Sequence, residues 1–385
     1  MGEILRMRNP VQHYAWGSRE VLARLRGEPV PSPEPEAELW VGAHPSAPSV
    51  VLLDGRERPL DRLVREDPEG FLPASARGGE LPYLLKILAI DAPLSIQVHP
   101  SPEQAEEGYE REQRAGIPRD DPRRNYKDRS AKPETVVALT EVELLTGVQP
   151  AERLRATADR LGLAWLRAAA DGERPVLPRV LALDDDAAAD AVAETVAAAR
   201  AAGPQDPVAA LVRYVHDRHP DDRGLLVAVC MRHVRLAPGQ ALHTPAGQVH
   251  AYLCGTAVEV MSSSDNVLRA GLTGKHVDVP ELLAVLAEVQ SDPEVVEPPA
   301  DEHGARVYPL WDERLSLVAH ELVPGRAVPF ELRGTAVLLA VGDRAVVRTP
   351  EAEWTLGGGE SLLHRGAPTA VELSGDARVF TVSCG

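Results

Sequence analysis

The sequence has little cysteine and no long apolar run. Among its 385 residues are three cysteines, Cys230, Cys254 and Cys384, and none shares CxxC spacing with another. This argues against a disulfide framework and against a thiolate zinc site. No run approaches the ~18 to 20 apolar residues of a membrane span, and the N-terminal segment is charged where a signal peptide needs an apolar core. We therefore expect a cytoplasmic protein with no membrane association.

Positive charge is also scarce. The chain has 41 Lys and Arg against 58 Asp and Glu, which gives a formal net charge of −17. Surfaces that bind DNA or RNA normally depend on an excess of Lys and Arg. The composition therefore argues against a nucleic-acid partner, and an anionic small substrate would need a locally positive pocket.

The chain is too long for one ordinary core, so two or three domains are expected. From residue 38 to about 150 it consists of short apolar runs separated by Gly and Pro, a pattern typical of strands. Between these runs, residues 100–117 predict a helix with Ser101 as its N-cap and Gly116 near its end. The polar tract 119–134 that follows is expected to be a loop.

Residues 151 to about 220 change character. Three Ala-rich amphipathic segments, 151–170, 184–203 and 206–219, are bounded by Asp, Pro and Gly. They predict three helices inserted between two β regions. The acidic run 184–186 could suggest a metal site, but acids at a helix N-terminus complement the macrodipole, and we interpret it that way.

Strand patterns return from residue 225 onward, with one clear helix at 280–289. The last seventy residues contain seven short apolar segments with tight turns, at 315–323, 328–334, 336–342, 344–349, 360–366, 369–375 and 378–383. A meander of this kind closes most naturally into a sandwich or jelly roll. The sequence therefore predicts a mainly β protein.

One short segment, 95–100, alternates polar and apolar side chains. In a strand, Ser95, Gln97 and His99 would share one face. Further types of ligand lie far from this segment in the sequence. They are in the extended segment around Lys132 and Glu134 and in the segment that carries His250. Together these segments offer the ligands of a metal site on a rigid scaffold. A more local set, with Glu103 as the third ligand after Gln97 and His99, ranks lower because Glu103 falls in a predicted helix.

Lys86 interrupts the apolar run 81–90. An unpaired ammonium is costly to bury. We therefore expect Lys86 to face a carboxylate, a pocket or an anionic ligand. The alternative is a lysine on an edge strand, whose ammonium extends into water.

Residues 247–275 hold more polar and charged side chains than folding demands. His250 and Tyr252 would share a strand face, and Glu259 could point into a cavity or into solvent. Arg269 and Lys275 are suited to clamp a phosphate, by bidentate and point-charge contacts respectively.

Several blocks of the chain, in order and over nearly its whole length, are similar to one family. The matching segments are 14–18 (YAWGS), 38–49, 81–100, 125–134 (NYKDRSAKPE) and 245–283. In these blocks the sequence resembles the type I mannose-6-phosphate isomerases, zinc enzymes of the cupin superfamily. The resemblance implies reversible isomerisation of mannose 6-phosphate and fructose 6-phosphate through an enediolate.

The resemblance also implies the roles of individual residues. It places one Zn²⁺ per chain on Gln97, His99, Glu134 and His250. The implied catalytic residues are Glu259, Arg269, Lys132, Lys86 and Asp265, and the implied substrate- and phosphate-binding residues are Ser95, Lys275, Arg269 and Tyr252. Glu259 is the leading candidate for the base, while Lys132 and Arg269 would stabilise oxyanions.

The implied architecture is a set of cupin-type jelly-roll or β-sandwich domains with an inserted all-α domain. Residues 1–150 would form the catalytic β domain, completed by 223–300. Residues 151–222 would form the helical insertion, and residues 301–385 a C-terminal β domain. The only expected partner is a small sugar phosphate, and the chain is expected to be a monomer.

Three positions depart from the family pattern. Ala131 stands where the family usually has His, Ser101-Pro102 replaces an Asp-Lys pair, and His243 stands where an aromatic or apolar residue is expected. Two alternative functions follow. One is an isomerase of a different or unphosphorylated sugar, with a pocket enlarged at Ala131, and the other is a silent zinc cupin that binds sugar phosphate without turnover.

Overall fold

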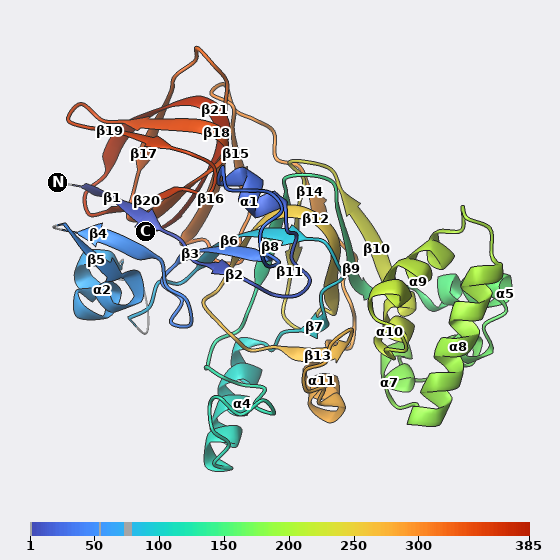
Figure 1. The fold of residues 1–385 in the computed structure, drawn as a ribbon. Coiled ribbons are helices and arrows are strands. Elements are labelled where there is room, and N and C mark those ends of the chain that lie inside the picture. Colours follow the sequence, from blue (N-terminus) through green and yellow to red (C-terminus); the bar gives the residue numbers. More distant parts are fainter. Residues whose placement is uncertain (1, 54, 73–78) are drawn as a thin grey trace.

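The computed structural model describes residues 2–53, 55–72 and 79–385. Two antiparallel sheets and a group of helices make up these residues (Figure 1). In the figure, the helical group lies on the side of the first sheet away from the C-terminal strands. In these residues, no helix is long and apolar enough to cross a membrane. The mainly β fold with an all-α insertion is confirmed.

The first sheet carries most of the predicted site residues. Its main path runs β14-β11-β8-β12-β6-β3-β2, with β7, β9, β10 and β13 attached beside β12. Its strands are β2 (Val11–Gln12), β3 (Glu38–Gly42), β6 (Leu84–Ile90), β7 (Ile96–Val98), β8 (Glu134–Ala138), β9 (Val142–Val148), β10 (Met231–Leu236), β11 (Ala241–Thr244), β12 (His250–Met261), β13 (Leu268–Gly271) and β14 (Val295–Val296).

The second sheet joins the two ends of the chain. Its main path runs β15-β16-β21-β18-β20-β1-β4-β5. Its strands are β1 (Glu3–Arg8), β4 (Val50–Leu53), β5 (Arg56–Pro59), β15 (Ala305–Tyr308), β16 (Leu315–Leu322), β17 (Val328–Leu332), β18 (Thr335–Arg348), β19 (Glu353–Leu356), β20 (Ser361–Arg365) and β21 (Thr369–Cys384). Three strands from the N-terminal part therefore complete a C-terminal sheet. The domain boundaries at 150, 222 and 300 stay predictions.

Two C-terminal strands are longer than predicted. The segments 336–342 and 344–349 belong to the single strand β18, and 369–375 and 378–383 belong to the single strand β21. Gly342 (φ +124°) and Gly375 (φ +138°), which stand at the ends of predicted segments, lie within these strands, and the register shifts between Gly342 and Arg344. A glycine inside a strand often marks such a bulge rather than a chain reversal.

The described residues also form helices around the two sheets (Figure 1). They are α1 (Val21–Leu25), α2 (Leu60–Glu66), α3 (Pro68–Phe71), α4 (Pro102–Arg114), α5 (Ala151–Leu161), α6 (Ala164–Ala170), α7 (Val176–Leu181), α8 (Asp185–Ala201), α9 (Pro207–Arg218), α10 (Gly224–Cys230) and α11 (Val279–Val285). The N-cap of α4 is confirmed, because Ser101 and Gln104 form a capping box. The acidic run also caps its helix, since Asp184 accepts from Ala187 N–H.

The helical insertion differs from the prediction in three places. The segment 151–170 is two helices, because Gly162 adopts a left-handed conformation (φ +70°) between α5 and α6. Helix α7 was not predicted. Residues 225–230 form helix α10 rather than a strand, and all of them are buried. A short, wholly buried apolar run has no exposed face, so periodicity cannot separate a helix from a strand.

Two apolar cores hold the layers together. One joins the helical insertion to the first sheet and includes Leu166, Val227, Val98 and Val249. The other lies between the two sheets and includes Val258 on β12 and Val337 on β18. Strand β12 therefore lies against packed side chains, and the polar residues it carries are held by a rigid element.

Candidate metal centre and active site

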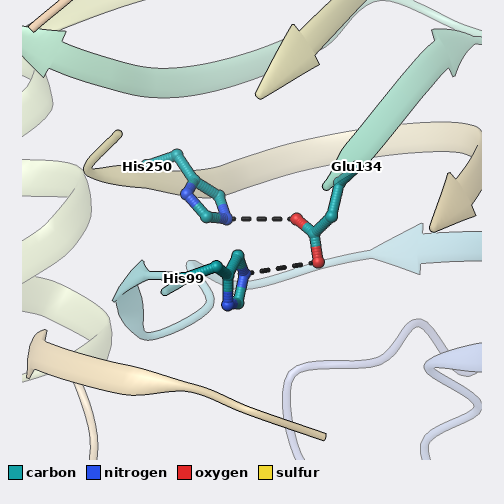
Figure 2. Close-up of side chains that lie close together, drawn as sticks. All are labelled: His99, Glu134 and His250. Carbon is teal, nitrogen blue, oxygen red and sulfur yellow. Dashed lines mark ion pairs between the residues drawn. The ribbon is translucent and has the colours of Figure 1, made fainter. Parts of the chain in front are cut away.

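Three buried ligand groups converge at one end of the first sheet (Figure 2). His250 begins β12, Glu134 begins β8, and His99 directly follows β7. His99 Nε2 lies 3.4 Å from Glu134 Oε1, and His250 Nε2 lies 3.1 Å from Glu134 Oε2. The three ligand atoms all lie within 4.8 Å of one another. Three segments that are distant in sequence thus present their ligands to one point.

Backbone carbonyls fix the orientation of both imidazoles. His99 Nδ1 lies 2.8 Å from the Asn266 carbonyl oxygen, and His250 Nδ1 lies 3.1 Å from the carbonyl oxygen of Gln248. Because a carbonyl only accepts, each Nδ1 carries the proton and each Nε2 turns a lone pair toward Glu134. This orientation by carbonyls is typical of histidines that bind a metal.

The protonation states also fit a cation. Burial and the nearby Lys132 ammonium lower the pKa of His99 to about 4, so its ring is neutral. Its Nε2 is buried and lacks a hydrogen-bond donor within the described residues. Burial alone would raise the pKa of Glu134, but the Lys132 ammonium holds it well below its usual range. Two lone pairs and a carboxylate that face each other match a divalent metal with N and O ligands.

Gln97 and Ser95 line the same space. Gln97 lies directly opposite His250 in the β7–β12 pairing, and its side-chain amide donates to Ser95 Oγ at 2.9 Å. Lys132, which is also buried, contacts Glu134 Oε1 at 2.6 Å. These residues surround a small cavity of about 50 Å³, together with Glu38, Lys86, Tyr252 and Glu259.

Lys86 lies in the centre of the sheet, not at an edge. Its strand β6 runs between β3 and β12. Its ammonium lies 3.3 Å from Glu38 Oε2 and 3.4 Å from Glu259 Oε2. Burial lowers the pKa of Lys86, but the two carboxylates outweigh it and the pKa is raised, so the ammonium stays charged. The expectation that Lys86 faces a carboxylate is confirmed, and the edge-strand alternative is wrong.

Glu259 points into the cavity rather than into solvent. It is 3% exposed, and Tyr252 donates its hydroxyl proton to Glu259 Oε1 at 3.0 Å. Burial, followed by the charge of Glu134, raises the pKa of Glu259 despite the nearby Lys86. A carboxylate with a raised pKa is suited to accept and return a proton near neutral pH.

The small cavity opens beside a larger cleft of about 820 Å³, which Ser95, Gln97, Lys86 and Lys132 also line. Further out, the cleft is lined by Arg269, Lys275 and Lys127. Within the described part of the chain, none of these three cations forms an ion pair with an acid. The outer cleft is therefore a positive region on a strongly acidic chain, as an anionic ligand requires.

Asp265 lies at the mouth of the cleft. Its Oδ1 is 3.5 Å from His44 Nε2, and its Oδ2 is 3.4 Å from Ser46 Oγ. Its backbone N–H donates to Asp128. Asp265 is thus separated from the metal-ligand group and belongs to the outer cleft.

Sequence reasoning assigned no role to several residues of the site. Glu38 pairs with Lys86, Asn266 holds both His99 and the backbone of Lys127, and His44 contacts Asp265. Glu38 could have been found, because it stands beside apolar residues in a segment that was predicted as a strand. Asn266 and His44 act through contacts across more than a hundred residues, which no local pattern shows.

Two residues considered from the sequence lie apart from the centre. Glu103 is exposed in the first turn of α4 and contacts Ser101 Oγ, so the local ligand set is not formed. His243 is an exposed residue of β11 whose Nδ1 faces Thr135 Oγ1 at 3.2 Å. It is an ordinary strand histidine.

Known proteins are similar to this chain in sequence and in fold. Residues 4–151 match the family described as phosphomannose isomerase type I, catalytic domain. The mannose-6-phosphate isomerase of Salmonella typhimurium is 34% identical over 97% of this chain and 98% of its own, and the human enzyme is 30% identical over 73% and 72%.

Solved structures agree over the full length. The crystal structure of the Salmonella typhimurium mannose 6-phosphate isomerase with bound fructose 6-phosphate and zinc superposes with a TM-score of 0.88, at 32% identity and over 99% of both chains. A zinc-bound mannose 6-phosphate isomerase structure also gives 0.88, at 31% identity and the same coverage. The chain belongs to the type I phosphomannose isomerase family.

Proposed function

We propose that this protein reversibly isomerises D-mannose 6-phosphate and D-fructose 6-phosphate, with one Zn²⁺ bound per chain. The observation that carries the proposal is the buried group of His99, Glu134 and His250 at the inner end of a cleft. The outer end of this cleft holds cations that form no ion pair with an acid among the described residues. The relative of 34% identity is a mannose-6-phosphate isomerase, and its structure has been solved with fructose 6-phosphate and zinc.

His99, Glu134, His250 and Gln97 are the proposed zinc ligands. All four are oxygen or nitrogen donors, a set that suits a catalytic zinc with a position left for substrate oxygen. When bound, the metal would supply a Lewis acid for the oxygens at carbons 1 and 2 of the sugar. Lys132 would add a fixed positive charge beside the same oxygens, because its ammonium is held against Glu134.

The reaction moves one proton from carbon 2 to carbon 1 of the aldose and a second from the oxygen on carbon 2 to the oxygen on carbon 1. We assign Glu259 the role of the base that takes the proton from carbon 2 of the aldose and returns it to carbon 1. Tyr252 contacts one of its oxygens and Lys86 contacts the other. These contacts fix the carboxylate inside the cavity and allow it to alternate between charged and neutral forms.

The phosphate is assigned to the outer cleft. Arg269 offers a planar pair of donors and Lys275 a mobile point charge. Ser95 Oγ accepts from Gln97, so its own proton remains for the substrate. We also assign Asp265 to the active site, at the mouth of the cleft, where its carboxylate lies next to His44.

The outer cleft, with Arg269, Lys275 and Lys127, favours a phosphorylated sugar over an unphosphorylated one. In the described residues, Ala131 lines neither the small cavity nor the cleft, and its carbonyl oxygen accepts from Ser262 Oγ at 2.7 Å. An enlarged pocket at Ala131 therefore has no support from the geometry. The substrate class is better argued from Arg269 and Lys275.

We also propose a monomer as the working unit. The cytoplasmic location is part of the same proposal and rests on sequence composition alone. Neither is needed for the chemistry of the site.

The proposal is tested by following conversion of mannose 6-phosphate to fructose 6-phosphate with the purified protein. The protein is assayed as prepared, after chelation and dialysis, and after zinc is returned. We expect conversion that chelation abolishes and zinc restores. Zinc-loaded protein that leaves mannose 6-phosphate unchanged would overturn the assignment.

A further inference from the structure

A carboxylate in the helical insertion contacts the loop that carries Lys275. Asp222 lies in the turn between α9 and α10, more than fifty residues before Lys275 in the sequence. Its Oδ1 accepts from the backbone N–H of Leu272 at 3.1 Å, and its Oδ2 accepts from that of Thr273, also at 3.1 Å. The same Oδ1 accepts from Gly224 N–H at 2.7 Å. One side chain thus binds the insertion to the loop after β13.

The loop needs an external partner at this point. Leu272 has φ +54°, a left-handed conformation that is rare for a leucine and costs free energy. Such a conformation persists where surrounding contacts determine it. The carboxylate of Asp222 provides these contacts, because charge-assisted hydrogen bonds to two successive amides fix the direction of the chain.

Two glycines allow this close approach. A Cβ atom at Gly271 would collide with the backbone of Gly224, and one at Gly224 would collide with the backbone of Leu272. Gly271 itself has φ +143°. The backbones of the insertion and of the loop are therefore in direct contact, with no side chain between them.

The contact extends to the lysine. Thr273, whose N–H is held by Asp222, accepts the backbone N–H of Lys275 on its Oγ1 at 3.1 Å. The same turn also braces the opposite wall of the cleft, since His219 Nε2 donates to the Pro93 carbonyl at 3.0 Å, two residues before Ser95. Both His219 and Lys275 line the cleft.

From these contacts we propose that Asp222 is a positioning residue for phosphate binding: it holds the 272–275 loop so that Lys275 faces the substrate. The inserted helical segment therefore contributes to substrate affinity although Asp222 itself does not touch substrate. This proposal rests on the proposed phosphate site at Arg269 and Lys275.

The test compares Asp222→Asn with Asp221→Asn. Asn at 222 keeps one acceptor oxygen but turns an amide NH₂ toward a backbone N–H, so a charge-assisted bond to the loop is lost. Asp221 is the matched control, because it is the exposed neighbour, and Asn tolerates its left-handed conformation (φ +59°). The measurements are kcat, KM for mannose 6-phosphate, competitive inhibition by inorganic phosphate, zinc content, and hydrogen exchange at the amides of Leu272 and Thr273.

For Asp222→Asn we expect KM and the inhibition constant of phosphate to rise together by about tenfold, the size of one charge-assisted hydrogen bond. We expect kcat to change less than about twofold, zinc content to be unchanged, and the two amides to exchange faster. Asp221→Asn should match the parent protein. Unchanged KM and phosphate inhibition with faster exchange, or a loss confined to kcat, would overturn the proposal.

Two further variants keep the outcome interpretable. If Asp222→Asn does not fold, Asp222→Glu decides. The Asp222→Glu side chain keeps its charge but is longer by one methylene. Its KM for mannose 6-phosphate should rise by a smaller factor, and inhibition by phosphate should weaken in parallel. An unchanged KM and unchanged phosphate inhibition would contradict the proposal. Lys275→Ala tests the phosphate assignment separately from the positioning role of Asp222. If it raises KM and Asp222→Asn does not, the positioning role fails alone, and if it leaves KM unchanged, the phosphate assignment itself fails.

Discussion

The two ends of the cleft are built differently. At the inner end, His99, Glu134 and His250 are buried, begin or follow strands of one sheet, and are oriented by backbone carbonyls or by Lys132. At the outer end, Arg269 is half-buried and Lys275 is exposed on a loop after the sheet. The inner end thus has fixed geometry, suited to chemistry on the carbonyl group. The outer end is open to solvent, where it can meet an anion, and depends on a distant segment for its position.

The largest effect is expected at the inner end. Glu134→Gln removes the only anionic ligand of the proposed site, so zinc should be lost on dialysis. Activity should fall about 10⁴-fold, because the Lewis acid contributes several kcal/mol to the transition state. Zinc content by atomic absorption and kcat are the measurements. His243→Gln, on the adjacent strand β11 but exposed, is the control and should keep both within about twofold. Full zinc content in Glu134→Gln would contradict the ligand assignment.

Glu259→Gln separates the proton transfer from metal binding. We expect kcat to fall about 10³-fold, within the usual range for loss of a general base, while zinc stays bound. An active variant with a full complement of zinc would remove Glu259 from this role.

The pH profile of the parent protein sharpens the same assignment. Glu259 must be deprotonated to accept the proton, so kcat should fall as the pH drops through its pKa. Burial raises that pKa above the usual ~4.3 of glutamic acid. The acidic limb should therefore lie at higher pH than for an exposed glutamate. A rate that stays constant down to pH ~4 would contradict this.

A smaller effect is expected at the outer end. Lys275→Ala should raise KM for mannose 6-phosphate about 10- to 30-fold and leave kcat nearly unchanged, because a charged contact to phosphate is worth roughly 1.5 to 3 kcal/mol. Unphosphorylated mannose is the paired substrate, and its turnover should be equally poor with or without the lysine. A lysine-dependent rate on mannose would show that the outer cleft does not recognise phosphate.

The smallest effect is expected outside both ends. Ser101→Ala removes the N-cap of α4 and should lower the free energy of unfolding by about 1 kcal/mol, with KM and zinc content unchanged. Thermal unfolding followed by circular dichroism measures this. A change in KM would mean that α4 helps to shape the site, and would contradict its placement outside both ends of the cleft.

The inner end could be predicted better than the outer end, for a physical reason. Strand alternation places Ser95, Gln97 and His99 on one face. Local reasoning also offered a carboxylate as one of the possible partners of the buried Lys86 ammonium, but it left an edge-strand lysine open and did not identify Glu38. The resemblance supplied the ligand set, and the structure brings its two histidines and its glutamate together.

The rest depends on contacts that no local pattern contains. Asp222 and Leu272 meet across fifty residues, and Asn266 reaches both His99 and Lys127. Helix α10 was mistaken for a strand because its residues are buried on all sides. Likewise, no local pattern predicts the pairing of β1 with β20, because these strands lie near opposite ends of the sequence.

The most direct test of the account starts the reaction from both sides. Zinc-loaded protein is incubated with mannose 6-phosphate alone and, separately, with fructose 6-phosphate alone, and both mixtures are followed by NMR. We predict that the two mixtures reach the same ratio of sugars, and that chelation stops both conversions. Protein that holds zinc and binds either sugar phosphate but converts neither would contradict it, and would identify a silent zinc cupin instead.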